Sequence, residues 1–225
     1  MAELVTPLSP APVEPFSQED ADGFQPLSHA QQRIWLMEQL HPGTAFANLG
    51  GLLVVRGPVR LELLAEALER FARSTEALRL ELRVEDGQAR QRLGAVHGGR
   101  VEQVDFSREA DPHAAAERWC TEQVRTPFAL PGGPLFRLAV VKLGERRGGY
   151  FACVHHLVGD GFSLGLLVRA VGRHYAALEA GVDVAPEPEP SYLRYVARER
   201  DYLASAESRE HRQQWHELLG GREAG

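Results

Sequence analysis

An apolar run that ends in two adjacent histidines constrains the fold of this chain more than any other stretch. Residues 150–154 are apolar, and His155 and His156 follow them directly. A glycine-rich turn that contains Asp160 comes next, and residues 162–178 then form a helix-like stretch. In α/β proteins, the loop that joins a strand to the following helix often carries reactive side chains. A histidine in that place can move a proton near neutral pH.

Side-chain alternation along a strand separates the two histidines. If the strand continues through them, one face carries Tyr150, Ala152, Val154 and His156, and the other carries Phe151, Cys153 and His155. The two imidazoles therefore cannot both face one substrate, and we expect one to be chemical and the other structural. A run that is apolar on both faces also predicts a central strand.

The composition describes a globular protein with its own core and argues against several classes of partner. Hydrophobic residues make up 44% of the 225 residues, which is ordinary for a folded domain. The formal net charge of −6 argues against nucleic-acid binding. No apolar run approaches the ~20 residues that a membrane span needs, and no signal peptide is visible, so we expect a cytoplasmic protein. Cys120 and Cys153 have no metal-ligand spacing and do not suggest a disulfide framework.

Periodicity and capping residues predict an α+β protein, a two-layer sandwich of a mostly antiparallel sheet with helices. Ser28 is a good N-cap for the first helix, and Asp111 followed by a proline opens another. The expected helices are residues 29–40, 61–71, 112–124, 162–178, 193–204 and 208–219. The expected strands are residues 52–56, 78–84, 88–93, 101–106, 135–143 and 149–155. Two hairpins are expected, with turns at residues 86–87 and 144–148.

Short motifs in a fixed order along the chain point to one family. The order His-His-x-x-x-Asp-Gly occupies residues 155–161. Further motif-like stretches are residues 27–35 (LSHAQQRIW), 77–82 (ALRLEL), 127–130 (PFAL) with 133–137 (GPLFR), and 214–219 (QWHELL). Together they resemble the condensation domains of nonribosomal peptide synthetases, whose fold is similar to that of chloramphenicol acetyltransferase. Arg79 fits the family pattern, whereas Ser74, Thr75 and Leu80 depart from it.

The resemblance covers about residues 26–219 and then stops. A complete domain of this family has two related lobes with the active-site tunnel between them, and this chain resembles the N-terminal lobe only. The resemblance implies a flexible leader at residues 1–25, the N-terminal lobe at residues 26–185, and a helical segment at residues 186–225 that leads towards a C-terminal lobe. Residues 186–190 alternate proline and glutamate, as a stiff spacer does.

The family forms an amide by attack of an amine on a thioester, and the resemblance assigns roles within the histidine motif. It gives the chemistry to His156, which either accepts the proton of the amine or holds the amine in position. His155 is then expected in a hydrogen-bonded pocket behind it. The N–H of Gly161 is a candidate donor to the oxyanion, because glycine lets the main chain approach closely.

Asp160 is expected to shape the loop rather than to act as the third member of a catalytic triad. In the family it pairs with an arginine, and the candidates here are Arg79 and Arg33. A carboxylate beside an arginine is usually an ion pair.

The resemblance also implies what such a lobe works with. It binds no cofactor; its substrates arrive on the phosphopantetheine of a peptidyl carrier protein or as acyl-CoA, and the C-terminal lobe completes the site. Residues 48–51 and 152–156 are similar to the starter subtype of surfactin-type lipopeptide synthetases, which acylates the first amino acid from a fatty acyl-CoA. An ordinary peptide-bond-forming domain is the alternative subtype.

Two alternatives to an acyltransferase stay open. Residues 161–165 satisfy Gly-x-Ser-x-Gly, the nucleophile elbow of serine hydrolases, with Ser163 as nucleophile. Against it, a polar loop separates the motif from its strand, and the histidines downstream, His211 and His216, lie in expected solvated helices; Ser163 is instead expected to cap the helix start. A non-catalytic docking or carrier-protein-binding module is the second alternative, which exposed apolar surface would favour.

Overall fold

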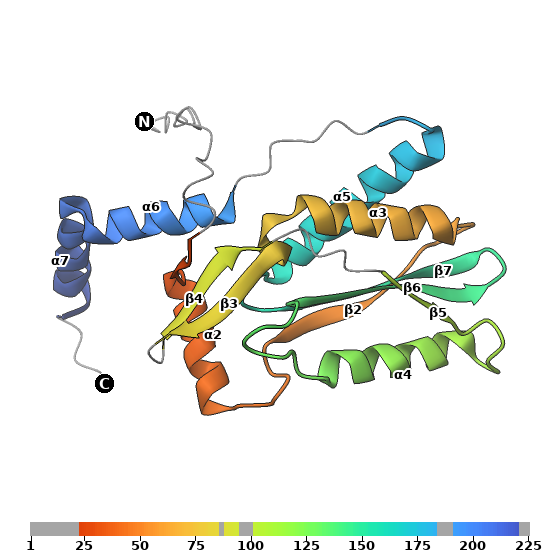
Figure 1. Cartoon of the computed structure of the whole chain (residues 1–225), viewed down its shortest axis with the longest axis horizontal. Helices are drawn as coiled ribbons and strands as arrows, with labels where there is room; N and C mark the ends of the chain where they lie inside the picture. Colours follow the sequence, from red (N-terminus) through yellow and green to blue (C-terminus); the bar gives the residue numbers. More distant parts are fainter. Residues whose placement is uncertain (1–22, 86–87, 95–100, 184–190, 221–225) are drawn as a thin grey trace.

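A four-stranded sheet forms the centre of the molecule in the computed structural model, which describes residues 23–85, 88–94, 101–183 and 191–220 (Figure 1). The strand order is β2 (Asn48–Val54), β7 (Arg147–His155), β6 (Phe136–Gly144) and β5 (Glu102–Asp105). β7 pairs antiparallel with β2 and with β6, whereas β5 lies parallel to β6. The predicted central strand is confirmed, because β7 has a neighbour on each side.

Helices cover both faces of this sheet. α3 (Leu61–Ser74) and α5 (Gly161–Ala180) pack on the face of β7 that carries Tyr150, Ala152 and Val154. α4 (Pro112–Arg125) packs on the opposite face, against Phe151 and Cys153 (Figure 1). The α+β class is confirmed, and the main sheet has one helical layer more than the two-layer sandwich expected, since a strand that is apolar on both faces needs cover on both.

A smaller sheet contains β1 (Gln25–Pro26), β4 (Gln88–Leu93) and β3 (Leu80–Glu85), in that order and antiparallel. The predicted hairpin of β3 and β4 is confirmed, while its turn at residues 86–87 lies outside the described residues. A 3₁₀ turn, η1 (Glu76–Arg79), replaces the start of the expected strand 78–84. Residues 1–22 of the expected leader lie outside the described residues. Gln25, also within the expected leader, belongs to β1 and pairs with Gln91 of β4.

Three more helices complete the described chain. α2 (His29–Leu40) begins at the predicted cap, where Ser28 and Gln31 form a reciprocal capping box. α6 (Tyr192–Ala204) and α7 (Ala206–Gly220) follow one another at one end of the molecule (Figure 1). α6 is fixed to the lobe because Tyr192 N–H donates to Glu76 Oε2 at 3.0 Å. No helix in the described ranges is long and apolar enough to cross a membrane.

Two glycine-rich stretches that resemble turns are parts of strands. β2 begins at Asn48, four residues before the expected start, and runs through the exposed pair Gly50-Gly51. A Cβ atom on Gly50 would lie 2.6 Å from the Ala152 carbonyl oxygen, so only glycine permits this close pairing with β7. The expected five-residue turn at 144–148 is likewise shorter, because Gly144 pairs with Arg147 and leaves two residues between the strands.

Candidate active site

The turn between β7 and α5 presents His156 to solvent. β7 ends at His155, and α5 begins at Gly161. The amide of His156 donates to the Ala47 carbonyl oxygen at 2.8 Å, and the Val158 amide donates to the His155 carbonyl oxygen at 3.0 Å. The main chain of the turn is therefore fixed while the His156 side chain is exposed.

His155 lies behind this turn with 2% of its surface exposed, as the sequence predicts. Its Nδ1 accepts a hydrogen bond from the Leu157 amide at 3.1 Å, so the ring proton belongs on Nε2, which lies 3.0 Å from Glu38 Oε1. Phe128 meets the ring edge-on, with centroids 5.9 Å apart. Burial lowers the pKa of His155, against the opposing effect of the Glu38 carboxylate, so the imidazole is held neutral.

A buried pair of glutamines supports the same turn from the other side. Gln31 Nε2 donates to the Leu157 carbonyl oxygen at 2.9 Å. Gln31 and Gln91 also exchange reciprocal side-chain hydrogen bonds at 2.9 and 2.8 Å, and both are buried. The sequence analysis missed Gln31, Gln91 and Glu38. For Gln31 the signal was its position three residues after the Ser28 cap, on the face of α2 turned to the core.

Asp160 is the N-cap of α5, and the expected ion pair with Arg79 or Arg33 is wrong. Its Oδ1 accepts from the Ser163 amide at 2.8 Å and from Ser163 Oγ at 2.7 Å. Within the described ranges, no ion pair joins Asp160 to either arginine. Asp160 is exposed and lies beside the free N–H groups of a helix start, which are the nearest donors. The hydrogen bonds from Ser163 hold the pKa of Asp160 below its ordinary value.

Ser163 is the third residue of α5 and completes a capping box, so it is not itself the N-cap that we expected. Its Oγ also accepts from the Asp160 amide at 3.2 Å. No histidine is among its hydrogen-bond partners in the part of the chain that the structure describes. His211, one of the two histidines considered for the triad, contacts Tyr202 in the terminal helices, Nδ1 to Oη 2.9 Å. The arrangement does not assemble a serine hydrolase triad.

Gly161 is exposed at the first position of α5, and open space lies where its Cβ would stand. Amides in the first turn of a helix lack intrahelical acceptors, and the helix dipole adds partial positive charge there. The Asp160 carboxylate lies near His156, at the start of the same turn's helix. The turn thus combines an imidazole with a helix start that can stabilise an oxyanion.

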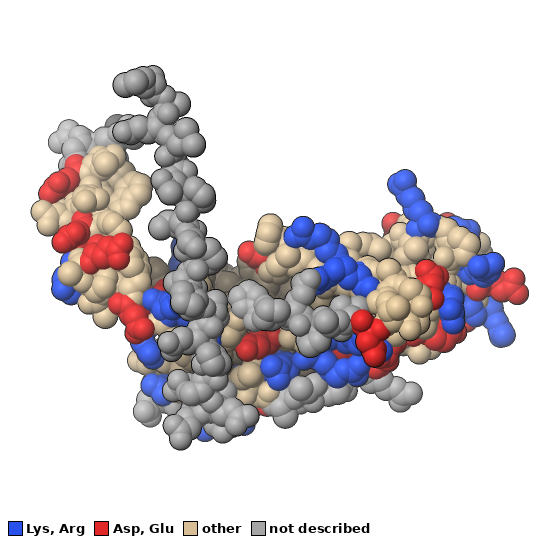
Figure 2. All heavy atoms as spheres, turned by 90° about the horizontal axis from the view of Figure 1, so that it is seen from above, with Lys and Arg blue, Asp and Glu red and all other residues tan. Residues whose placement is uncertain are grey.

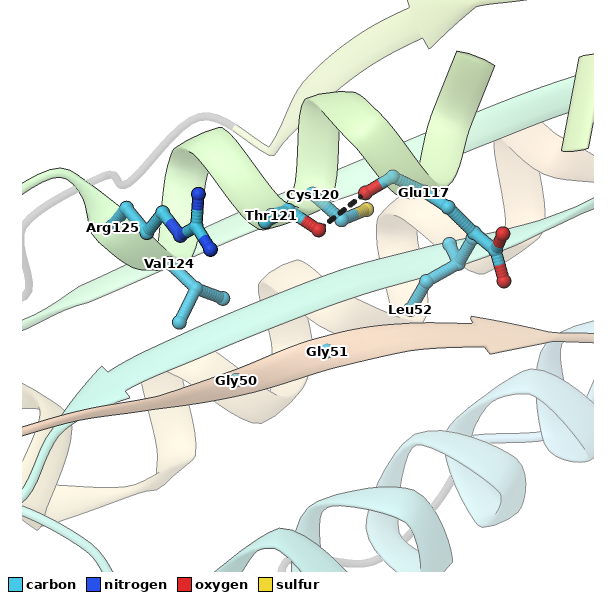
Figure 3. A pocket seen from close by; sticks show the side chains of 8 residues that line it. All are labelled: Gly50, Gly51, Leu52, Glu117, Cys120, Thr121, Val124 and Arg125. Carbon is cyan, nitrogen blue, oxygen red and sulfur yellow. Dashed lines mark hydrogen bonds between the residues drawn. The ribbon is translucent and has the colours of Figure 1, made fainter. Parts of the chain in front are cut away.

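Two cavities of the described chain lie away from His156. One of about 510 Å³ opens between β2 and α4, lined by residues that include Gly50, Gly51, Cys120 and Arg125 (Figure 3). Burial raises the pKa of the Cys120 thiol to about 11, which makes it a poor nucleophile at neutral pH. A second cavity of about 370 Å³ lies behind the turn, next to Glu38.

Charged side chains do not gather into a basic field. Lys and Arg lie next to Asp and Glu along the face seen in Figure 2. On α3, for example, Arg70 pairs with Glu66 and Arg73 with Glu69, as expected for a solvated helix face. No cluster of three or more His, Cys, Asp or Glu side chains in the described ranges could hold a metal ion.

Comparisons with known proteins agree with the motifs. The family model "Condensation domain" matches residues 21–224. Surfactin synthase subunit 1 of Bacillus subtilis is 29% identical over 185 residues, which are 81% of this chain and 5% of that protein. Phosphinothricin tripeptide synthetase PhsC of Streptomyces viridochromogenes is 33% identical over 215 residues, 94% of this chain and 20% of that protein.

Solved structures show the same relationship. The starter condensation domain of rhizomide synthetase RzmA superposes with a TM-score of 0.83 at 28% identity, covering 90% of this chain and 49% of that one. The first condensation domain of the CDA synthetase superposes with a TM-score of 0.74 at 29% identity, covering 89% and 51%. The chain thus spans about half of the solved domains and a small part of each synthetase.

Proposed function

The chain belongs to the condensation-domain family of nonribosomal peptide synthetases, and from this premise we propose that it supplies the histidine-bearing lobe of an amide-forming acyltransferase. The substrates are an acyl thioester and the amine of an aminoacyl group on a peptidyl carrier protein. A second, C-terminal lobe completes the site, and we place the reaction in the cytoplasm.

The exposed His156 imidazole beside the N-terminus of α5 is the observation that carries this proposal. The amine nitrogen attacks the thioester carbonyl, the C–N bond forms and the C–S bond breaks. His156 accepts or positions the proton that the amine loses, and that proton leaves with the thiol. The Gly161 N–H stabilises negative charge on the carbonyl oxygen. No acyl-enzyme is needed, because the thioester is already activated.

Exposed apolar side chains support a covering second lobe. Near the turn they are Phe162 and Leu166 on α5, and on α7 they include Trp215, Leu218 and Leu219. Large exposed apolar side chains are candidates for contact with another protein surface. His156 is exposed and lines neither cavity described above, and we propose that another part of the complete domain closes over it.

We propose the starter subtype, in which the acyl donor is a fatty acyl-CoA. The RzmA domain that resembles this chain is a starter condensation domain, and its mutants were solved with C8-CoA and with Leu-SNAC. Its TM-score exceeds that of the CDA synthetase domain. An aminoacyl or peptidyl carrier protein as donor would instead identify an ordinary peptide-bond-forming domain.

The test uses the two-lobe domain of which this chain forms the N-terminal half. Intact-protein mass spectrometry of the acceptor carrier protein should reveal acylation with octanoyl-CoA and not with an aminoacyl carrier donor. His156→Ala should lower the rate by about 10²–10⁴-fold, the usual contribution of a positioned acid–base group. Ser163→Ala is the matched control and should keep most of the activity. Loss of transfer with Ser163→Ala but not with His156→Ala would overturn the proposal.

A further inference from the structure

α2 presents two polar side chains to the turn that carries His156. Gln31 and Glu38 are seven residues apart, two helical turns, and so share one face of α2. Gln31 Nε2 donates to the Leu157 carbonyl oxygen at 2.9 Å, and Glu38 Oε1 lies 3.0 Å from His155 Nε2. The helix therefore holds the turn at its main chain and at the His155 ring.

The hydrogen bonds of His155 require one tautomer. Because the Leu157 N–H donates to Nδ1, this nitrogen must carry a lone pair, and the proton must lie on Nε2. The group facing Nε2 must then be an acceptor. A carboxylate oxygen can only accept, so Glu38 supplies this acceptor; a glutamine amide oxygen could do the same, whereas alanine could not.

The orientation of the His155 ring passes directly to the next residue. The ring binds the amide of Leu157, on the C-terminal side of His156, while the His156 amide is bound to Ala47 on the other side. His155 is 2% exposed and the Glu38 side chain 11%, so water competes little for these bonds. Because the peptide groups on both sides of His156 are hydrogen-bonded, the position of its Cα atom and the direction of its Cα–Cβ bond are fixed.

We propose that Glu38 is a positioning residue: by fixing the Nε2–H tautomer of His155, it sets the turn from which His156 acts. Its effect on catalysis rests on the proposed function, whereas its effect on His155 does not. The two parts are therefore measured separately.

The first measurement is ¹⁵N NMR of this chain with labelled histidine. In the parent chain, His155 should show a protonated Nε2 and an unprotonated Nδ1, and the His156 amide should exchange slowly with solvent. Glu38→Ala should broaden or shift both His155 nitrogens and speed exchange at His156. Glu38→Gln should keep both the hydrogen bond and the parent tautomer, because its amide oxygen can accept from Nε2–H. Gln39→Ala, the exposed neighbour on α2, is the control and should change neither signal.

The second measurement is acyl transfer by the two-lobe domain. Glu38→Ala should lower kcat by about 10- to 100-fold, the cost of displacing a reacting group by a fraction of an ångström to 1 Å, with KM little changed. Glu38→Gln should recover most of that loss, and Gln39→Ala should match the parent. Unchanged His155 nitrogens in Glu38→Ala, or a kcat for Glu38→Gln as low as for Glu38→Ala in folded protein, would overturn the proposal. If the parent domain makes no amide, the proposed function fails while the NMR result still decides the role of Glu38.

Discussion

His155 and His156 are neighbours of the same residue type, but His155 is the last residue of β7 and His156 is the first residue of the turn that follows. One is buried among Glu38, Phe128 and the Leu157 amide, and the other is exposed. Their separation could be predicted, because alternation along a strand does not depend on the rest of the fold. The identity of the buried partner could not, because Glu38 lies 117 residues away in the sequence and its contact depends on how α2 docks.

This difference in burial predicts effects of very different size on stability for two alanine substitutions. His155→Ala should lower the free energy of unfolding by on the order of 2–3 kcal/mol, because it leaves the Leu157 amide and Glu38 without their partner. His156→Ala should change it by about 0.5 kcal/mol or less, as exposed positions do. Urea unfolding followed by circular dichroism measures both, and equal midpoints would contradict the assignment.

Asp160 stabilises the protein as a helix cap, which sets both the size and the pH dependence of its contribution. A buried ion pair would have made Asp160→Ala cost roughly 3–5 kcal/mol. Loss of an exposed N-cap costs about 1 kcal/mol, and Asp160→Asn should be nearly neutral at pH 7 because asparagine caps equally well.

The sign of the pH effect follows from the lowered pKa of Asp160 in the folded protein. The stabilisation is complete above the unfolded pKa of about 3.9 and is lost as the pH falls through the folded pKa below it. Thermal unfolding between pH 7 and pH 2.5 should therefore converge for the parent and Asp160→Ala. A difference in melting temperature that persists unchanged at the lowest pH would contradict this account.

At the scale of elements, local chemistry predicts helices better than strand ends. The caps at Ser28 and Asp111 lie where their sequences place them, because the cap bonds to amides only two or three residues away. β2 was predicted to begin late, because Gly50-Gly51 resembles a turn and only the neighbouring β7 explains it as strand. The parallel pairing of β5 with β6 likewise depends on a distant partner.

Arg137 on β6 ties the end of α4 to the main sheet, which makes the element junction testable. Its guanidinium donates to the carbonyl oxygens of Gln123, Thr126 and Pro127 at 3.0, 2.8 and 2.7 Å, and it stacks 4.0 Å from the Phe128 ring centroid. Arg137→Lys keeps the charge but loses the planar fork. It should lower the free energy of unfolding by about 1–2 kcal/mol, whereas Arg125→Lys, at an exposed position at the end of α4, should not. Equal urea midpoints for the two variants would show that the fork is dispensable.

At the scale of the whole molecule, the lobe holds the histidine motif rigidly but does not enclose it. The main chain of the turn is held by α2, by the Ala47 carbonyl oxygen next to β2 and by the start of α5, so the point from which the His156 side chain projects is fixed in this half alone. To hold two substrates in a reactive geometry, the protein must contact them from both sides of the site. The effective molarity falls steeply when the contacts on one side are absent. The chain covers about half of each solved domain, and the motif resemblance likewise covers one lobe.

The chain by itself should therefore not catalyse amide formation. Mixed with octanoyl-CoA and an aminoacyl carrier protein, it should give product at the uncatalysed rate, because nothing closes over His156. Its exposed apolar residues on α5 and α7 should instead make it self-associate, which multi-angle light scattering across a concentration series measures. Substituting Trp215 and Leu218 by serine should reduce that association without lowering the melting temperature, because both side chains are more than 60% exposed. Addition of the C-terminal lobe in trans should restore His156-dependent transfer. Turnover at a normal rate by the isolated chain would show that the second wall is not required.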